Sequence, residues 1–206
     1  MYKLYYMPGA CSMAVHVILN ELGQQVTLEN ATVAETKNEL LKVNPRGAVP
    51  VLVDDKQVIR EGAAIVLHLL EKHKNTLFPA SGAERATALE WLMFCNATLH
   101  PAYARAFGAL RYFEGETQQK VLTVAVPQIN KLWEEVESRL AGSPYLCGKE
   151  LTAADILLTV IANWSGKFEG KIKLGENTKR LLRNVIARPS YQKALATEQV
   201  EYKAAA

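Results

Sequence analysis

The pattern of apolar residues changes after Phe78, and this change most constrains how the chain can fold. Before it, short strand-like runs alternate with short amphipathic segments, whereas after it apolar residues recur at helical spacing. Residues 78–82 combine proline, serine and glycine and have the composition of a linker. The sequence therefore predicts three parts: an α/β domain over 1–78, a linker with the start of a long helix over 79–86, and an all-helical domain over 87–206.

The α/β part has the element order βαβ followed by ββα. β-branched and aromatic runs between turn residues predict the strands: 2–6, 26–29, 50–53 and 57–59. Apolar residues at helical spacing predict the helices: 11–22, 35–43 and 63–73. In the helical part, Ser81 with Glu84 and Thr152 with Asp155 have the spacing of capping boxes, and Pro101 predicts a disturbance in the first long helix.

Composition excludes several classes of protein. The 206 residues are 49% hydrophobic and 22% charged, which is typical of globular chains and excludes a disordered one. The net charge of +3 is too small to predict a nucleic-acid partner or an anionic membrane surface. No run of 18 apolar residues exists, so no membrane span is expected either. The excess charge lies after residue 78, since the first 78 residues carry 8 basic and 8 acidic side chains.

The chain has three cysteines, Cys11, Cys95 and Cys147, and their spacing fits neither a disulfide framework nor a zinc site. Reduced thiols in the cytoplasm and no metal are therefore expected. Cys11 stands out because it follows a strand and a Pro-Gly turn and falls in the first turn of a helix. The free N–H groups and the helix dipole there stabilise an anion, which predicts a lowered thiol pKa and a reactive thiolate. The alternative is an inert, buried cysteine.

Two further segments have the chemistry of a peptide-binding site. In the segment NPRGAVP (residues 44–50) a cis Val49–Pro50 bond would turn the backbone N–H and C=O of Val49 outward, ready to pair with an extended peptide. Glu61 offers a carboxylate to an ammonium group, and the Gly62 N–H at a helix N-terminus suits a carboxylate. Together these two residues match the head of a zwitterionic amino acid. The alternatives are an ordinary loop and a simple acid on the helix dipole.

Four segments in order carry a family resemblance: YYMPGACS at 5–12, NPRGAVP at 44–50, EGAAI at 61–65 and LHP at 99–101. Over essentially its whole length the chain resembles bacterial cytosolic glutathione S-transferases of the beta class. The resemblance implies the glutathione S-transferase fold, with a thioredoxin-like N-terminal domain, an all-α C-terminal domain, an active site between them and assembly as a homodimer.

The resemblance also implies roles for individual residues. By position, Cys11 matches the cysteine that faces glutathione, Val49 the residue whose backbone pairs with the cysteinyl part, and Pro50 the cis-proline. Glu61 matches the residue that holds the γ-glutamyl end. His100 resembles the histidine that reaches the sulfur from the helical domain, the alternative being a packed core or surface histidine.

Several departures from the family pattern concern glutathione affinity, and two of them are single residues. Gly62 stands where the family has Ser or Thr, so a hydroxyl donor is lost, at a cost of about 1–3 kcal/mol for a hydrogen bond to a charged group. Met93 stands where the family has Asn, and Asn96, one turn further on, is a candidate to compensate. Ser12, next to Cys11, is a candidate second hydroxyl donor to the sulfur.

The sequence thus predicts a detoxifying transferase that conjugates glutathione, its co-substrate, to small hydrophobic electrophiles, or that reduces mixed disulfides through Cys11. The electrophile is expected against an aromatic wall of the helical domain: Tyr103, Phe107, Trp164 and Phe168. One alternative is a non-catalytic binding or regulatory module of the same fold, with the basic segment 167–188 as its partner surface. Another is a glutathione-dependent isomerase or dehalogenase.

Overall fold

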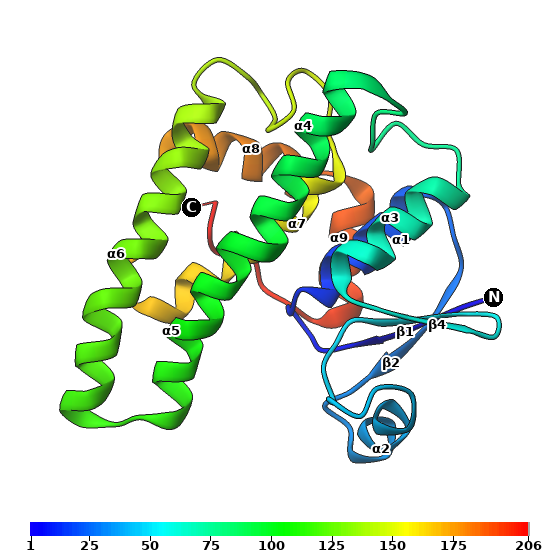
Figure 1. The fold of residues 1–206 in the computed structure, drawn as a ribbon, viewed down its shortest axis with the longest axis horizontal. Coiled ribbons are helices and arrows are strands. Elements are labelled where there is room, and N and C mark those ends of the chain that lie inside the picture. Colours follow the sequence, from blue (N-terminus) through cyan, green and yellow to red (C-terminus); the bar gives the residue numbers. More distant parts are fainter. Residues whose placement is uncertain (206) are drawn as a thin grey trace.

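The computed structural model describes residues 1–205, in which an α/β domain is followed by a helical domain (Figure 1). The α/β domain consists of β1 (Tyr2–Tyr6), α1 (Ser12–Glu21), β2 (Val26–Asn30), α2 (Ala34–Val43), β3 (Val51–Asp54), β4 (Gln57–Arg60) and α3 (Gly62–Lys72). The helical domain consists of α4 (Gly82–Met93), η1 (Phe94–Leu99), α5 (His100–Tyr112), α6 (Gly115–Leu140), α7 (Ala153–Asn163), η2 (Trp164–Phe168), α8 (Glu176–Ile186) and α9 (Pro189–Glu198). The predicted order βαβ, ββα and then helices is confirmed.

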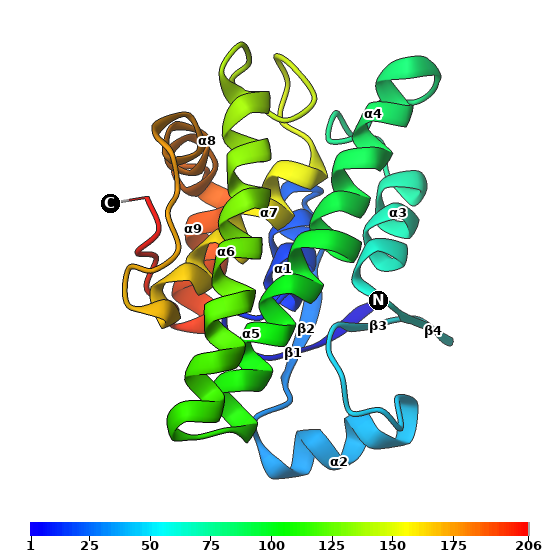
Figure 2. The ribbon, with the colours of Figure 1, turned by 60° about the vertical axis from the view of Figure 1, so that its left-hand side comes forward.

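The sheet has the strand order β2-β1-β3-β4, with β1 parallel to β2 and the other pairs antiparallel. The crossover helix α1 makes the first pair parallel, and the short β3–β4 connection makes a hairpin. Side chains alternate across the sheet: Leu4 belongs to the core shared with α1 and α3, whereas Tyr5 packs with Leu40 of α2. Accordingly α1 and α3 cover one face and α2 the other (Figure 2).

The first long helix is interrupted as predicted. α4 ends at Met93, the π-helical turn η1 follows, and α5 begins at His100 with Pro101 in its first turn. Proline has no N–H to donate to the carbonyl four residues before it and its ring clashes with that carbonyl, so the hydrogen-bond pattern is disturbed near Pro101. His100 is the first residue of the helix that follows this interruption.

The two predicted capping boxes have different outcomes. Thr152 and Asp155 form one at the start of α7, where the Thr152 N–H donates to Asp155 Oδ2 over 2.7 Å. At the start of α4 the prediction is wrong, because Ser81 makes no side-chain capping bond. Ser81 and Glu84 are exposed, so water can satisfy the free N–H groups, whereas the start of α7 is buried and needs partners from the protein.

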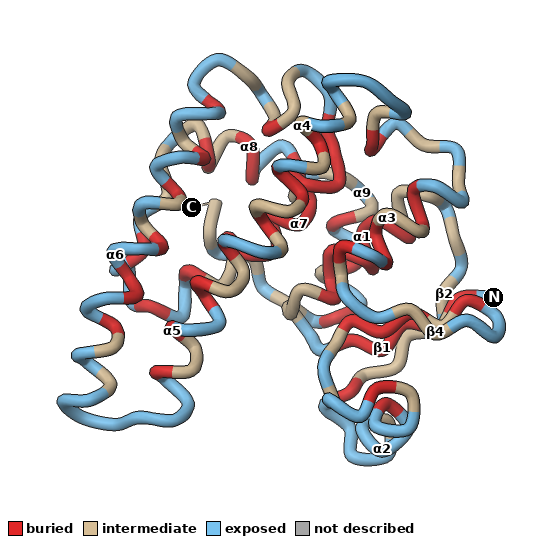
Figure 3. Tube along the Cα trace, viewed as in Figure 1, coloured by how far each residue is buried: buried red, intermediate tan, exposed pale blue. Residues whose placement is uncertain are grey.

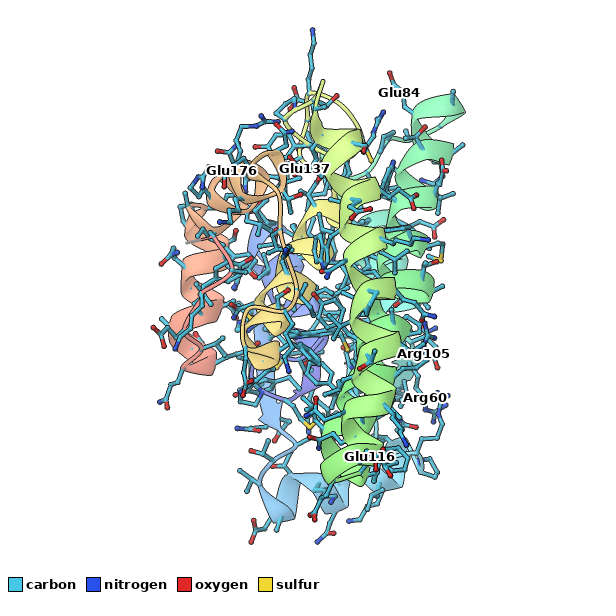
Figure 4. The ribbon with its side chains drawn as sticks, turned by 90° about the vertical axis from the view of Figure 1, so that its left-hand side faces the viewer. Arg60, Glu84, Arg105, Glu116, Glu137 and Glu176 are labelled. Atoms are coloured by element: carbon cyan, nitrogen blue, oxygen red, sulfur yellow. The ribbon has the colours of Figure 1, made fainter. Side chains whose placement is uncertain are left out.

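α7 is the centre of the helical domain and also joins it to the α/β domain. All its residues from Ala153 to Ala162 are buried, and it contacts α1, α4 and α8 (Figure 3). Farther out, Glu137 of α6 lies beside the start of α8, where it accepts the N–H groups of Asn177 and Thr178 (Figure 4). Within residues 1–205, no helix combines the length and the apolar character that crossing a membrane requires.

Candidate active site between the two domains

A cleft of about 800 Å³ lies between the loops of the α/β domain and the helices α5 and η2. Cys11, Val49 and His100, which are far apart in the sequence, all line it. Most of the remaining lining residues are apolar: Met7, Pro8, Ala48, Ala104, Phe107 and Leu110. The cleft therefore offers a thiol, a peptide backbone and an imidazole in a mostly hydrophobic surround.

A tight turn over residues 7–10 directly precedes Cys11 and places it at the cleft. The Ala10 N–H donates to the Met7 carbonyl over 3.0 Å, and Gly9 has φ +67°, as expected when Pro8 and Gly9 are the central residues of a type II turn. Cys11 is the N-cap of α1. Its thiol donates to the Val49 carbonyl oxygen, with Sγ 3.6 Å from that atom.

The pKa of Cys11 differs from the sequence-based prediction. Burial raises the pKa of the thiol to about 11, although hydrogen bonds from the backbone N–H groups of Ser12 and Cys11 oppose the rise. The charge of Glu61 adds to the rise. The prediction of a lowered pKa is wrong because loss of water around the sulfur outweighs the stabilisation that the helix N-terminus gives the thiolate. Cys11 is therefore a thiol at neutral pH.

The Val49–Pro50 peptide bond is cis, as the sequence analysis considered. The loop before it is held by Asn44, whose side-chain amide donates to the Ala48 carbonyl over 2.8 Å. Among residues 1–205, no protein group accepts the Val49 N–H. The Val49 N–H is thus free to pair with an extended ligand in the cleft, whereas the Val49 carbonyl already accepts the Cys11 thiol.

Glu61 and Gly62 lie at the start of α3, next to this loop. A Cβ atom added to Gly62 would lie 3.6 Å from Pro50 Cγ and 3.7 Å from Asn96 Oδ1, so Gly62 adjoins both residues. The predicted compensating residue Asn96 is therefore beside the glycine. The Glu61 carboxylate is exposed and pairs with Arg46 Nη2 over 2.7 Å, a partner that the sequence analysis did not foresee.

His100 reaches the cleft from the first turn of α5, and its ring centroid lies 5.2 Å from that of Trp164. Burial lowers the pKa of His100, so the imidazole is neutral at pH 7 and can accept a proton. Phe107 and Trp164 line the cleft, while Tyr103 and Phe168 are buried behind them. Of the predicted aromatic wall, only Phe107 and Trp164 therefore line the cleft. The buried rings of Tyr103 and Phe168 both pack against Phe107.

Both halves of the chain match family models. Residues 4–77 match the glutathione S-transferase N-terminal domain, and residues 86–189 match the glutathione S-transferase C-terminal domain. The chain belongs to the glutathione S-transferase family. This result agrees with the resemblance inferred from the four sequence segments.

Individual members of the family are similar over most of their length. Glutathione S-transferase GstA of Escherichia coli O157:H7 is 29% identical over 95% of this chain and 98% of its own. Glutathione S-transferase GST-4.5 of Xanthomonas campestris pv. campestris is 33% identical over 80% and 83%. A glutathione S-transferase from Xylella fastidiosa superposes with a TM-score of 0.89 at 27% identity over 98% and 100%. A sphingomonad glutathione S-transferase complexed with glutathione does so with a TM-score of 0.82 at 26% identity over 97% and 100%.

Ser12 does not fit the role that we expected for it in a glutathione S-transferase site. Its hydroxyl accepts the Met7 N–H over 3.2 Å and donates to the Met7 carbonyl over 3.3 Å, so it supports the turn and does not point at the sulfur. Of the polar groups of Ser12, it is the backbone N–H that hydrogen-bonds to the Cys11 sulfur and opposes the rise of its pKa. All three cysteines are free, with Cys95 buried and Cys147 partly buried outside the cleft. Among residues 1–205, no cluster of three or more histidine, cysteine or acidic residues is suited to a metal ion.

The sequence analysis missed some of the residues that line the cleft. Thr32 and Lys167 line the cleft; nothing in the local sequence marks Thr32, and Lys167 was considered only as the start of the basic segment 167–188. Trp164 was expected only as an aromatic surface, yet its indole N–H donates to the Gly9 carbonyl over 2.8 Å. Contacts of this kind join residues that are distant in the chain and leave no periodic or spacing signal.

The raised pKa of Cys11 has a measurable consequence. In the protein without glutathione, we expect the rate of Cys11 alkylation by iodoacetamide to rise about tenfold per pH unit from pH 7 to 9, because the thiolate fraction does so below the pKa of about 11. Mass spectrometry of the Cys11 peptide separates its rate from those of Cys95 and Cys147. A rate that is already constant above pH 7 would show a lowered pKa and contradict this prediction.

Proposed function

We propose that glutathione binds in an extended form along Val49, with its sulfur beside Cys11 and its γ-glutamyl head at Glu61 and Gly62. The observation that carries the proposal is the succession of neighbours from Cys11 through Val49 and Pro50 to Gly62. Cys11 Sγ is 3.6 Å from the Val49 carbonyl, and Gly62 adjoins Pro50, the next residue along. The family membership and the glutathione complex of the sphingomonad relative support the same ligand.

The first reaction is conjugation. Glutathione gives up its thiol proton, for which the neutral imidazole of His100, which lines the cleft, is a candidate acceptor. The thiolate attacks an electrophilic carbon, a carbon–sulfur bond forms, and the leaving group, such as a halide, departs with the electron pair. The apolar wall of Phe107 and Trp164 favours a hydrophobic electrophile.

The second reaction is disulfide reduction. Cys11, which is a thiol at neutral pH, gives up its proton and attacks the glutathione sulfur of a mixed disulfide. The sulfur–sulfur bond breaks, and the second thiol leaves as a thiolate with the electron pair and takes up a proton. A glutathione thiolate then attacks the mixed disulfide on Cys11, which releases oxidised glutathione and regenerates the Cys11 thiolate. Ala14 stands three residues after Cys11, so no second cysteine of a Cys-x-x-Cys motif can resolve the intermediate.

The proposal extends to the setting of the reaction. As the family resemblance implies, we propose a cytoplasmic homodimer that acts in detoxification. The isomerase and dehalogenase alternatives use the same glutathione site and differ in the second substrate. The non-catalytic module differs in a testable way, because it predicts loss of glutathione binding.

Substitution at Gly62 tests the binding mode. A serine side chain fits, because its Cβ would meet only ordinary contacts, and its hydroxyl restores the donor that the family has at this position. We expect Gly62→Ser to bind glutathione about tenfold more tightly than wild type in titration calorimetry, the gain of one hydrogen bond to a charged group.

The matched control is Gly62→Ala, which adds the same Cβ without a hydroxyl and should bind like wild type. Equal affinities for the serine and alanine variants would place the γ-glutamyl carboxylate elsewhere. No heat of binding for any of the three folded proteins would overturn the proposed function and favour the non-catalytic module.

A further inference from the structure

Gly9 is held at both of its backbone polar groups by the helical domain. Its N–H donates to Glu198 Oε2 over 3.0 Å, and its carbonyl accepts the indole N–H of Trp164 over 2.8 Å. Glu198 is the last residue of α9 and Trp164 the first of η2. The elements α9 and η2 of the helical domain thus both hydrogen-bond to one residue of the turn that precedes Cys11.

Glu198 is placed to hold the turn firmly. Glu198 is only 3% exposed. Its second carboxylate oxygen, Oε1, lies 2.9 Å from Nδ1 of His16 in α1. Both carboxylate oxygens are therefore engaged, one with the helix that starts after Cys11 and one with the turn before it. A buried carboxylate with fixed partners on both oxygens has little freedom to move.

Gly9 has φ +67°, and a Cβ atom added to it would lie 3.5 Å from Val200 Cγ2, just past Glu198. The turn therefore lies directly against the segment that follows α9. Trp164 also lines the cleft and contacts the His100 ring, so the same indole touches the turn and the second functional side chain.

We propose that Glu198 and Trp164 are positioning residues, which orient Cys11 for reaction by holding the N–H and the carbonyl of Gly9. The inference rests on the proposed role of Cys11 as the reactive thiol. It assigns the helical domain a second task besides binding the electrophile: it fixes the geometry of the nucleophile that the α/β domain provides.

The test compares Glu198→Ala with Glu198→Gln. Alanine leaves the Gly9 N–H without its acceptor, so we expect kcat for disulfide reduction to fall by about tenfold or more while KM for glutathione stays within about twofold. The glutamine side chain retains an oxygen for Gly9 and an amide group for His16, and it should restore most of kcat. Trp164→Phe, which keeps an aromatic side chain but removes the indole N–H, should lower kcat in the same way.

The matched control is Glu21→Gln. Like Glu198, Glu21 is a carboxylate that links α1 to the α9 region. Glu21 lies in α1 and binds Arg188 and Ser190, but it does not contact the turn before Cys11. It should lower the free energy of unfolding in urea without changing kcat. If Glu198→Ala loses no more kcat than Glu21→Gln at equal stability, the residue only fastens α9 and the inference is wrong. If Glu198→Ala does not fold, Trp164→Phe decides in the same way.

Alkylation of Cys11 by iodoacetamide separates this inference from the proposed function. It needs no glutathione, and we expect it to be at least about threefold faster in Glu198→Ala than in wild type, because a released turn lets water reach the sulfur. A faster alkylation with no dependence of activity on Cys11 would overturn the proposed function alone. An unchanged alkylation rate in Glu198→Ala would overturn the positioning role.

Discussion

Cys11→Ala is expected to lower the rate of hydroxyethyl disulfide reduction by on the order of a thousandfold, the largest change in activity that we predict. The reaction needs a covalent mixed disulfide on this sulfur, and alanine removes the only cysteine that lines the cleft within residues 1–205. Conjugation of glutathione to an aryl halide should fall by about tenfold or less, because there the attacking thiolate belongs to glutathione. Steady-state assays of both reactions on one preparation measure the difference.

Cys147→Ala is the matched control, since this cysteine is also partly buried but does not line the cleft. It should leave both activities unchanged. If Cys11→Ala keeps full activity in both assays, the role that we propose for Cys11 is wrong. An equal, large loss in both would assign the cysteine to conjugation as well.

Asp155→Ala is expected to lower the free energy of unfolding by about 3–5 kcal/mol, the largest stability change that we predict. The Asp155 carboxylate is fully buried and accepts the N–H groups of Leu146 and Thr152 over 2.8 and 2.7 Å, together with the Thr152 hydroxyl. Alanine leaves two buried N–H groups without an acceptor, that of Thr152 at the start of α7, the central helix of the fold, and that of Leu146 in the loop before it. Urea unfolding followed by circular dichroism measures the loss.

Asp155→Asn distinguishes capping from charge. It keeps the size of the side chain but turns an amide group toward one of the two N–H donors, so it should lose at least about 2 kcal/mol. Ser81→Ala is the control, because Ser81 has the same sequence spacing to an acid but makes no capping bond. It should change stability by less than about 0.5 kcal/mol. A similar loss in the Ser81 and Asp155 variants would show that burial does not decide the strength of these caps.

Much of the fold followed from features within a few residues of one another. Alternating and helical apolar patterns predicted the strands and helices, and the Pro-Gly turn predicted where Cys11 begins a helix. Pro101 predicted the interruption before α5 because its effect on hydrogen bonding is local. Such features depend on backbone chemistry and on neighbours one turn away, so they are readable without the tertiary structure.

The candidate site was predictable in part. Cys11, Val49 and His100, selected from separate sequence segments, line one cleft. Ser12 was misjudged because a hydroxyl beside a cysteine can turn to the sulfur or to the backbone, and its bonds with Met7 are set by the shape of the turn. The partner of Glu61 was missed because Arg46 reaches it across a loop.

By itself, the sequence determined the order of the elements and the change from an α/β part to an all-helical part, because these depend on short-range patterns. Only the tertiary structure decided how the site behaves. Burial sets the pKa of Cys11 above its usual value, and the contacts of Gly9 with Glu198 and Trp164 come from the other domain. Desolvation and long-range hydrogen bonds depend on what the whole fold brings together, and a helix N-terminus read alone gives the opposite sign for the thiol.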